Sequence, residues 1–265
     1  MTPRAPAPAR PMNPPQHIWY FAYGSNLSSS TLTDSRGITP LTSARVSLPG
    51  WTLAFTIPGL PYREPVFASI TPRPNSDNKT NTCIPDVTGV AYLLTAAQYT
   101  RLVASEGGGA VYASIPVAAV PVGAEDARRL GGEGVVVWTL TTGLLARKCG
   151  RPSARYMDII EDGAAESGLP VEYRGYLAEV GRYEGPRGLR RRLGAALFLA
   201  VWVPVMSIVH RLVEMTIGID GLAPPGVRAV VRAVFVLMWL WHDYVHAPVW
   251  GRGDGAEECN AKGKC

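Results

Sequence analysis

The chain has 265 residues, 47% of them hydrophobic, and a formal net charge of +5. This is enough apolar material for one large domain or two small ones with a real core, so the chain is expected to fold. Much of the basic excess lies at Arg187 and residues 190–192, and no helix-turn-helix or zinc-finger pattern accompanies it. We therefore expect no nucleic-acid partner, because a DNA-binding protein pairs a basic face with such a motif.

The first residues of the chain and its cysteines indicate the cellular compartment and the state of the thiols. Residues 1–16 are rich in proline and lack the apolar run of a signal peptide, which predicts a disordered lead and a cytoplasmic protein. The four cysteines are too scattered for a disulfide scaffold, and none forms the close pairs of a structural zinc site. We expect free thiols and no metal at Cys83, Cys149, Cys259 and Cys265.

Short runs rich in Val, Ile, Thr and aromatic residues, broken by turn residues, dominate residues 18–140 and predict strands. The expected strands are residues 18–23, 45–48, 51–57, 66–70, 87–94, 111–120 and 135–140. Many short antiparallel strands favour a barrel or a sandwich. The polar stretch from Arg73 to Ile84 is expected to be an exposed loop.

Three helices are predicted next to these strands. Thr95 can cap a helix that leads to Ser105 and Glu106, and Ser153 can cap a second helix that ends at the GLP of residues 168–170. A third helix is expected over residues 173–180.

The C-terminal part is far more apolar. Two runs, residues 195–209 and 233–241, fall short of the roughly 18 uninterrupted apolar residues of a simple transmembrane helix, and His210 and Arg211 end the first. We interpret residues 185–250 as a helical hairpin that either packs on the barrel or enters a membrane interface, and residues 251–265 as a flexible tail. Residues 17–184 form the main domain.

Two short segments carry candidate chemistry. In WYFAYGSNL, residues 19–27, Gly24 lets the backbone approach a ligand, and the surrounding amides with Ser25 and Asn26 suit a carboxylate or a polarised carbonyl oxygen. An ordinary strand-turn is the alternative. Glu106 lies between an apolar helix face and three glycines, where it is either a partly desolvated base or a solvated helix end. EGGG lacks the Lys-Ser/Thr pair of a phosphate loop.

YFAYGSNL at residues 20–27 resembles the signature of the γ-glutamylcyclotransferase family. Glu106-Gly107 with Tyr112 is similar to that family's catalytic-glutamate segment, and residues 152–177 to its C-terminal helix pair. The resemblance implies an α+β fold with a small, mostly antiparallel barrel and flanking helices. Two departures are a glutamate-to-tyrosine spacing one residue shorter than usual and Trp138 in place of a family tyrosine. The longer form resembles fungal members, including those of gliotoxin-type (epidithiodiketopiperazine) biosynthesis.

The resemblance implies that the α-amine of a γ-glutamyl group attacks its own side-chain carbonyl, releasing 5-oxoproline and an amine without cofactor or metal. Glu106 would be the general acid/base. The implied substrate-binding residues are Tyr20, Phe21, Ala22, Tyr23, Gly24, Ser25, Asn26 and Leu140. The substrate would be glutathione or a glutathione conjugate, including bis-glutathionyl diketopiperazines.

Three alternatives to a soluble cyclotransferase stay open on the sequence. A hydrolase would use Ser25 as nucleophile, although all four histidines lie in the terminal regions (His17, His210, His242 and His246). A non-catalytic barrel could bind a ligand or serve as a membrane-attached interaction module. A cyclotransferase could also meet a membrane peripherally through its apolar hairpin.

Overall fold

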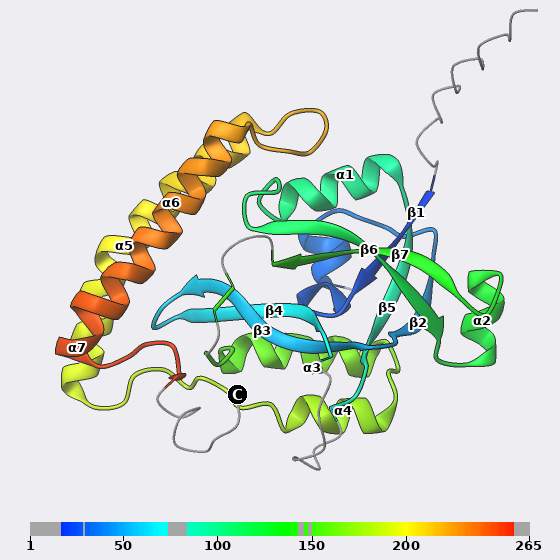
Figure 1. Cartoon of the computed structure of the whole chain (residues 1–265), viewed down its shortest axis with the longest axis horizontal. Coiled ribbons are helices and arrows are strands. Elements are labelled where there is room, and N and C mark those ends of the chain that lie inside the picture. Colours follow the sequence, from blue (N-terminus) through cyan, green and yellow to red (C-terminus); the bar gives the residue numbers. More distant parts are fainter. Residues whose placement is uncertain (1–16, 29, 74–83, 143–145, 148–149, 257–265) are drawn as a thin grey trace, which may run out of the picture.

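The computed structural model describes residues 17–28, 30–73, 84–142, 146–147 and 150–256, and its centre is a closed five-stranded barrel (Figure 1). In spatial order the strands are β1 (His17–Ala22), β5 (Val87–Thr95), β2 (Thr42–Leu48), β6 (Tyr112–Pro121) and β7 (Val135–Thr142). Neighbouring strands are antiparallel except β1 and β7, which meet in parallel where Tyr20 lies opposite Trp138. The predicted small, mostly antiparallel barrel is confirmed.

Two of the expected strands do not join the barrel. β3 (Trp51–Leu60) and β4 (Glu64–Pro72) form a separate two-stranded ribbon, with a register shift between Ala54 and Ile57. Such irregularities bend a strand and increase its twist. The ribbon extends past the barrel, and Tyr62 at its tip packs among residues of the C-terminal helices.

The helix starts follow the predicted caps. The Thr95 side chain and Gln98 form a complete capping box at α1 (Ala96–Ser105), and the Ser153 hydroxyl accepts the Tyr156 N–H at the start of α3 (Ala154–Glu166). The third predicted helix is α4 (Val171–Ala178). Three short elements were not predicted from the sequence. They are η1 (Ser25–Leu27), η2 (Thr31–Ser35) and α2 (Ala124–Leu130).

The C-terminal region is a helical hairpin, as predicted, but its helices are longer than the apolar runs. It comprises α5 (Leu189–Thr216), α6 (Pro225–Trp241), η3 (His242–His246) and α7 (Ala247–Trp250). His210 and Arg211 do not end α5, because both side chains are exposed and polar residues are common on the solvent side of a helix. α5 has 28 residues and its most apolar 18-residue window has a mean hydropathy of 2.0, so it is long and apolar enough to cross a membrane by length and composition alone.

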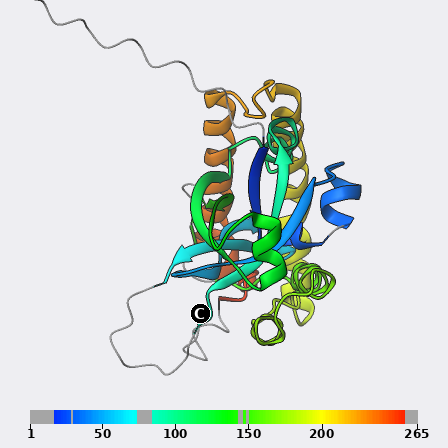
Figure 2. The same ribbon diagram turned by 90° about the vertical axis from the view of Figure 1, so that its right-hand side faces the viewer.

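The hairpin packs on the rest of the chain at two places. Near its base, Phe198 and Met238 form a buried cluster with Tyr62 of the β3–β4 ribbon. Near its tip, Val213 and Ala223 form another with Ala110, just before β6. Figure 1 shows α5 and α6 along one edge of the molecule, and in the view turned by 90° they run side by side behind the barrel (Figure 2).

The start of the expected flexible tail is instead held in place. Asp254 is fully buried and accepts from Arg147 and Arg252, so residues 251–256 belong to the folded part. Several predictions lie outside the described residues and stay predictions. They concern the lead (1–16), most of the loop at 73–84, the four cysteines and the last residues (257–265).

Candidate active site

The turn after β1 is where the sequence predicts an amide-lined cradle. Tyr20 to Ala22 lie in register with β5, so their backbone groups belong to the barrel ladder. Beyond Ala22 the chain leaves the ladder and enters η1. A Cβ on Gly24 would lie 3.0 Å from the Tyr156 hydroxyl and 3.5 Å from the Ala68 Cβ, so a larger residue would push this turn away from its neighbours.

Glu106 lies against the same turn although it is far away in sequence. It directly follows Ser105, the last residue of α1, and its backbone N–H still donates to the Leu102 carbonyl at 3.1 Å. Its side chain is 14% exposed, and its Oε1 accepts from Asn26 Nδ2 at 3.0 Å. The structure thus places the carboxylate in a sheltered position beside the turn.

Asn26 connects the glutamate to the barrel wall. It is 5% exposed, and its amide nitrogen also donates to the Tyr20 hydroxyl at 2.8 Å. Its amide oxygen accepts from Arg36 Nε at 2.7 Å. With these partners a buried amide has one favourable orientation, so Asn26 fixes both Tyr20 and Glu106.

Arg36 is a functional candidate that sequence reasoning missed. It follows η2, and its Nη2 lies 2.7 Å from Glu106 Oε1 while its Nη1 donates to the Ser105 hydroxyl at 2.5 Å. No motif surrounds it, and it comes close to Glu106 through the fold alone. Within the described part of the chain Arg36 and Asn26 both contact Oε1, and no hydrogen bond or ion pair reaches Oε2. The pair fixes the position of the glutamate side chain and leaves Oε2 without a hydrogen bond among the described residues.

Replacing Arg36 should therefore impair turnover more than stability. Arg36→Met removes the contacts to Glu106, Asn26 and Ser105, and misplacing a reacting group by about 1 Å commonly costs about 10²-fold in rate. Steady-state kinetics would show a fall in kcat with a smaller change in KM. Arg101→Met on α1, which loses an exposed contact to the Gly37 carbonyl, is the matched control. Equal kinetics for the two variants would refute this role.

Three buried tyrosines and the partly buried Tyr112 lie near the carboxylate. Burial, reinforced by the negative charge of Glu106, raises the pKa of Tyr20, Tyr23, Tyr112 and Tyr156 well above the usual value, so all four are neutral hydroxyls at physiological pH. Tyr156 was expected on a helix face but not in the site. Its hydroxyl accepts the backbone N–H of Ala68 at 3.3 Å and that of Ser25.

The remaining candidates differ in whether their side chains make polar contacts or pack in the core. The Tyr23 hydroxyl donates to the Leu140 carbonyl, which joins two of the residues singled out from the sequence. Phe21 and Ala22 are buried in the barrel core, so their side chains pack there. Only their backbone groups could take part in the site. Trp138 is 38% exposed on the outside of β7, whereas Tyr20 opposite it is buried.

The glycine loop after Glu106 contacts the tip of the C-terminal hairpin. Gly107, Gly108 and Gly109 all have positive φ, at 87°, 56° and 75°, which explains why glycines follow the glutamate. The Ala223 N–H donates to the Gly108 carbonyl at 3.0 Å, and Arg232 Nε donates to the Ala110 carbonyl at 3.0 Å. Figure 1 shows the α5–α6 turn beside the end of α1. The hairpin therefore supports the segment that carries Glu106.

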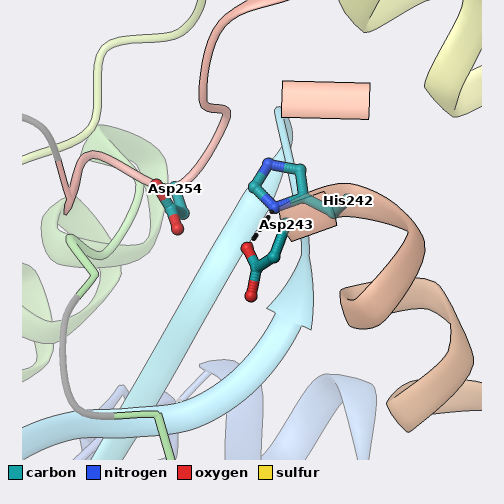
Figure 3. A group of neighbouring side chains, drawn as sticks. All are labelled: His242, Asp243 and Asp254. Atoms are coloured by element: carbon teal, nitrogen blue, oxygen red, sulfur yellow. Dashed lines mark hydrogen bonds and ion pairs between the residues drawn. The ribbon is translucent and has the colours of Figure 1, made fainter. Parts of the chain in front are cut away.

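A second cluster of polar groups lies at the hairpin base. His242, Asp243 and Asp254 point toward one another, with metal-binding atoms within 4.8 Å (Figure 3). Arg147 and Arg252 each pair with both carboxylates, and the Nδ1 of His242 contacts Asp243 at 2.8 Å. These hydrogen bonds hold the pKa of the Asp243 carboxyl below its usual range, against the opposing effect of burial. Two guanidinium groups already occupy the carboxylates, which makes this an ion-pair network and a poor cation site.

The barrel and the sheltered Glu106 beside the Gly24 turn have the arrangement that the sequence resemblance implies. Comparison with known proteins agrees. Gamma-glutamyl cyclotransferase aclK from Aspergillus oryzae is 40% identical over 250 residues, covering 90% of each chain. Gamma-glutamyl cyclotransferase gliK from Aspergillus fumigatus is 37% identical over 246 residues, covering 90% of this chain and 89% of its own. The chain belongs to the γ-glutamyl cyclotransferase family and is an enzyme of that class.

The comparisons also distinguish the two parts of the chain. A solved structure titled gamma-glutamyl cyclotransferase superposes with a TM-score of 0.50 and 22% identity, covering 65% of this chain and 93% of its own, which shows a shared fold. Residues 188–249 match a separate family model described as the AclK C-terminal domain. This matched region coincides with the hairpin.

Proposed function

We propose that this γ-glutamyl cyclotransferase acts on glutathione or glutathione-derived conjugates, with Glu106 as general acid/base. The observation that carries the mechanism is the single carboxylate held by Asn26 and Arg36 beside the Gly24 turn. The chemistry needs one group that accepts a proton and returns it, and Oε2 of Glu106 is unengaged among the described residues.

The reaction conserves all atoms of the substrate. The α-nitrogen of the γ-glutamyl group loses a proton to Glu106 and bonds to the γ-carbonyl carbon, which closes a five-membered ring. The bond from that carbon to the leaving nitrogen then breaks, and Glu106 returns the proton to this nitrogen. Because the ring closure is intramolecular, the enzyme chiefly has to fold the substrate and manage the proton.

The turn after β1 would hold the substrate. We propose that the backbone amides of Tyr23, Gly24 and Asn26 bind the glutamyl α-carboxylate or the oxyanion, where the loss of one donor commonly costs about 2.7–4 kcal/mol in the barrier. Neutral tyrosine hydroxyls suit this role, because they donate hydrogen bonds without repelling an anion. Tyr20 and Tyr23 would form the walls of the site.

Hydrolysis through Ser25 is disfavoured by the position of the histidines, all of which are described. His210 lies 3.2 Å from Glu214 on α5, while His242 and His246 are at the hairpin base and His17 opens β1. A serine nucleophile needs an adjacent base. Ser25→Ala should therefore retain most of the 5-oxoproline-forming activity, measured by product chromatography. Loss of turnover comparable to that of Glu106→Gln would instead indicate a nucleophilic serine.

The substrate is tested by comparing glutathione with a bulky bis-glutathionyl diketopiperazine. We expect 5-oxoproline from a γ-glutamyl substrate, with a higher kcat/KM for the conjugate. The reason for the preference is the resemblance to fungal members of gliotoxin-type biosynthesis; the two Aspergillus relatives, which are named gamma-glutamyl cyclotransferases, support the broader substrate class. A preference for free glutathione would contradict the proposal that a conjugate is the substrate. The absence of 5-oxoproline from both reactions would contradict the proposed substrate class.

A further inference from the structure

The outer face of the C-terminal hairpin is apolar except in the last turns of α5, where His210, Arg211 and Glu214 are exposed. On α5 the exposed positions from Leu193 to Ile208 carry no charge, and Leu197 and Val201 are 54% and 59% exposed. From Ala229 to Val249 the exposed positions are again uncharged, with Leu237 60% exposed. Only 28% of the most apolar window of α5 is buried, whereas the core helix of a soluble protein is mostly buried. A contiguous exposed surface of this kind marks an interaction site.

The charged groups of the hairpin are arranged around this face. Residues 188–249 contain six arginines and three acidic residues. Arg190, Arg191 and Arg192 are exposed at the start of α5, immediately before the charge-free stretch. In contrast, Arg232 and Asp243 are only partly exposed and make contacts within the molecule. Basic residues at the end of an apolar helix face are typical of helices that bind anionic lipid.

Exposed amphipathic aromatic residues add to this pattern. Trp241 is 48% exposed and Tyr244 is 77% exposed, on the same part of the hairpin as Leu237 and Leu240. Tryptophan and tyrosine are enriched at the level of lipid headgroups, because one end of the side chain is apolar and the other polar. From the apolar face, the arginines and these aromatics, we propose that the outer face of α5 and α6 binds the surface of a bilayer containing acidic phospholipids.

The contacts of the hairpin decide between lying on the bilayer and crossing it. At the tip of the hairpin, the Ala223 N–H donates to the Gly108 carbonyl. Near its base, the Tyr62 hydroxyl donates to the Gly251 carbonyl at 2.5 Å. Inserting α5 across a bilayer would break both contacts and expose the clusters around Phe198 and Ala110. The hairpin therefore lies in the interface plane with its barrel-facing side still packed.

A second copy of the chain is a less suitable occupant of this face. The chain carries a formal net charge of +5 with the arginine cluster on the hairpin itself, so two copies repel each other. A surface of phosphatidylserine carries the opposite charge and attracts each exposed arginine. The choice of a bilayer rests on this complementarity together with the apolar face.

Flotation of the full-length protein with vesicles tests the proposal directly. We expect binding to vesicles of phosphatidylcholine mixed with phosphatidylserine, and weak binding to pure phosphatidylcholine. Leu237→Glu should reduce binding about tenfold, because it places a charge in the apolar face. Val171→Glu, on α4 and 64% exposed, is the matched control and should bind as the unmodified protein does. Arg192→Gln should weaken binding to the acidic vesicles about fivefold.

Two results would overturn the proposal. The first is absence of binding to the acidic vesicles by protein that is folded by circular dichroism. The second is a stable dimer in sedimentation velocity, dissociated by Leu237→Glu and indifferent to vesicles, which would assign the face to a second copy. Both measurements are made without a substrate, so they test lipid binding separately from the proposed function. Turnover of a soluble γ-glutamyl substrate should be unchanged in Leu237→Glu.

Discussion

Glu106→Gln should lose nearly all cyclotransferase activity while remaining folded. Glutamine can still accept from Asn26 and Arg36 through its amide oxygen, so the local geometry survives. It cannot take up and return a proton, and a positioned acid/base contributes about 10²–10⁴-fold. We therefore expect kcat to fall by about this factor with little change in KM.

Thermal unfolding and a control variant make this result interpretable. Glu125→Gln on α2 removes an exposed carboxylate that pairs with Arg129, and it should leave turnover unchanged. The melting temperature of Glu106→Gln should remain near that of the unmodified enzyme. Undiminished turnover in Glu106→Gln would contradict the catalytic assignment.

Gly108→Ala should lose far more activity than Gly107→Ala. Both residues have positive φ, so alanine at either costs about 1–2 kcal/mol of backbone strain. An alanine Cβ at Gly108 would also lie 2.9 Å from the Ala223 backbone nitrogen, whereas nothing lies within 4 Å of a Cβ at Gly107. Relieving this clash must move the glycine loop or the hairpin tip, and Glu106 lies two residues away. We expect a further loss of about 10²-fold in kcat for Gly108→Ala.

The comparison of these two glycine variants isolates the hairpin contact from the general cost of replacing glycine. Kinetics and thermal melting should be measured on both proteins. Similar activity in the two variants would show that the hairpin tip does not support the catalytic loop, and that the extension serves another purpose.

Local patterns predict the strands and single out the segments around Gly24 and Glu106, whereas the choice of a barrel and the catalytic role of Glu106 come from the family resemblance. Runs of β-forming residues predict the strands, the Thr95 and Ser153 caps fix two helix starts, and Gly24 and residues 107–109 mark places where the backbone needs glycine. The separation of β3 and β4 from the barrel was not predictable. Which strands pair is decided by contacts between distant residues, and the register shift that bends the ribbon has no local signature.

The parts of the site that sequence reasoning missed depend on long-range contacts. Arg36 reaches Glu106 across 70 residues of chain, and Tyr156 reaches the Gly24 turn from α3. Neither residue belongs to a motif whose spacing would reveal its partner. The hairpin was predicted as an element, but its support of the Gly108 loop follows from a backbone hydrogen bond that any residue type could make.

Oxygen-isotope labelling tests the proposed chemistry most directly. The purified enzyme would be given a γ-glutamyl substrate in water enriched in oxygen-18, and the products analysed by mass spectrometry. Intramolecular attack by the α-nitrogen predicts 5-oxoproline without label, because no water oxygen enters the product. Glutamate carrying one labelled oxygen would show hydrolysis and contradict the account of Glu106 and the Gly24 turn.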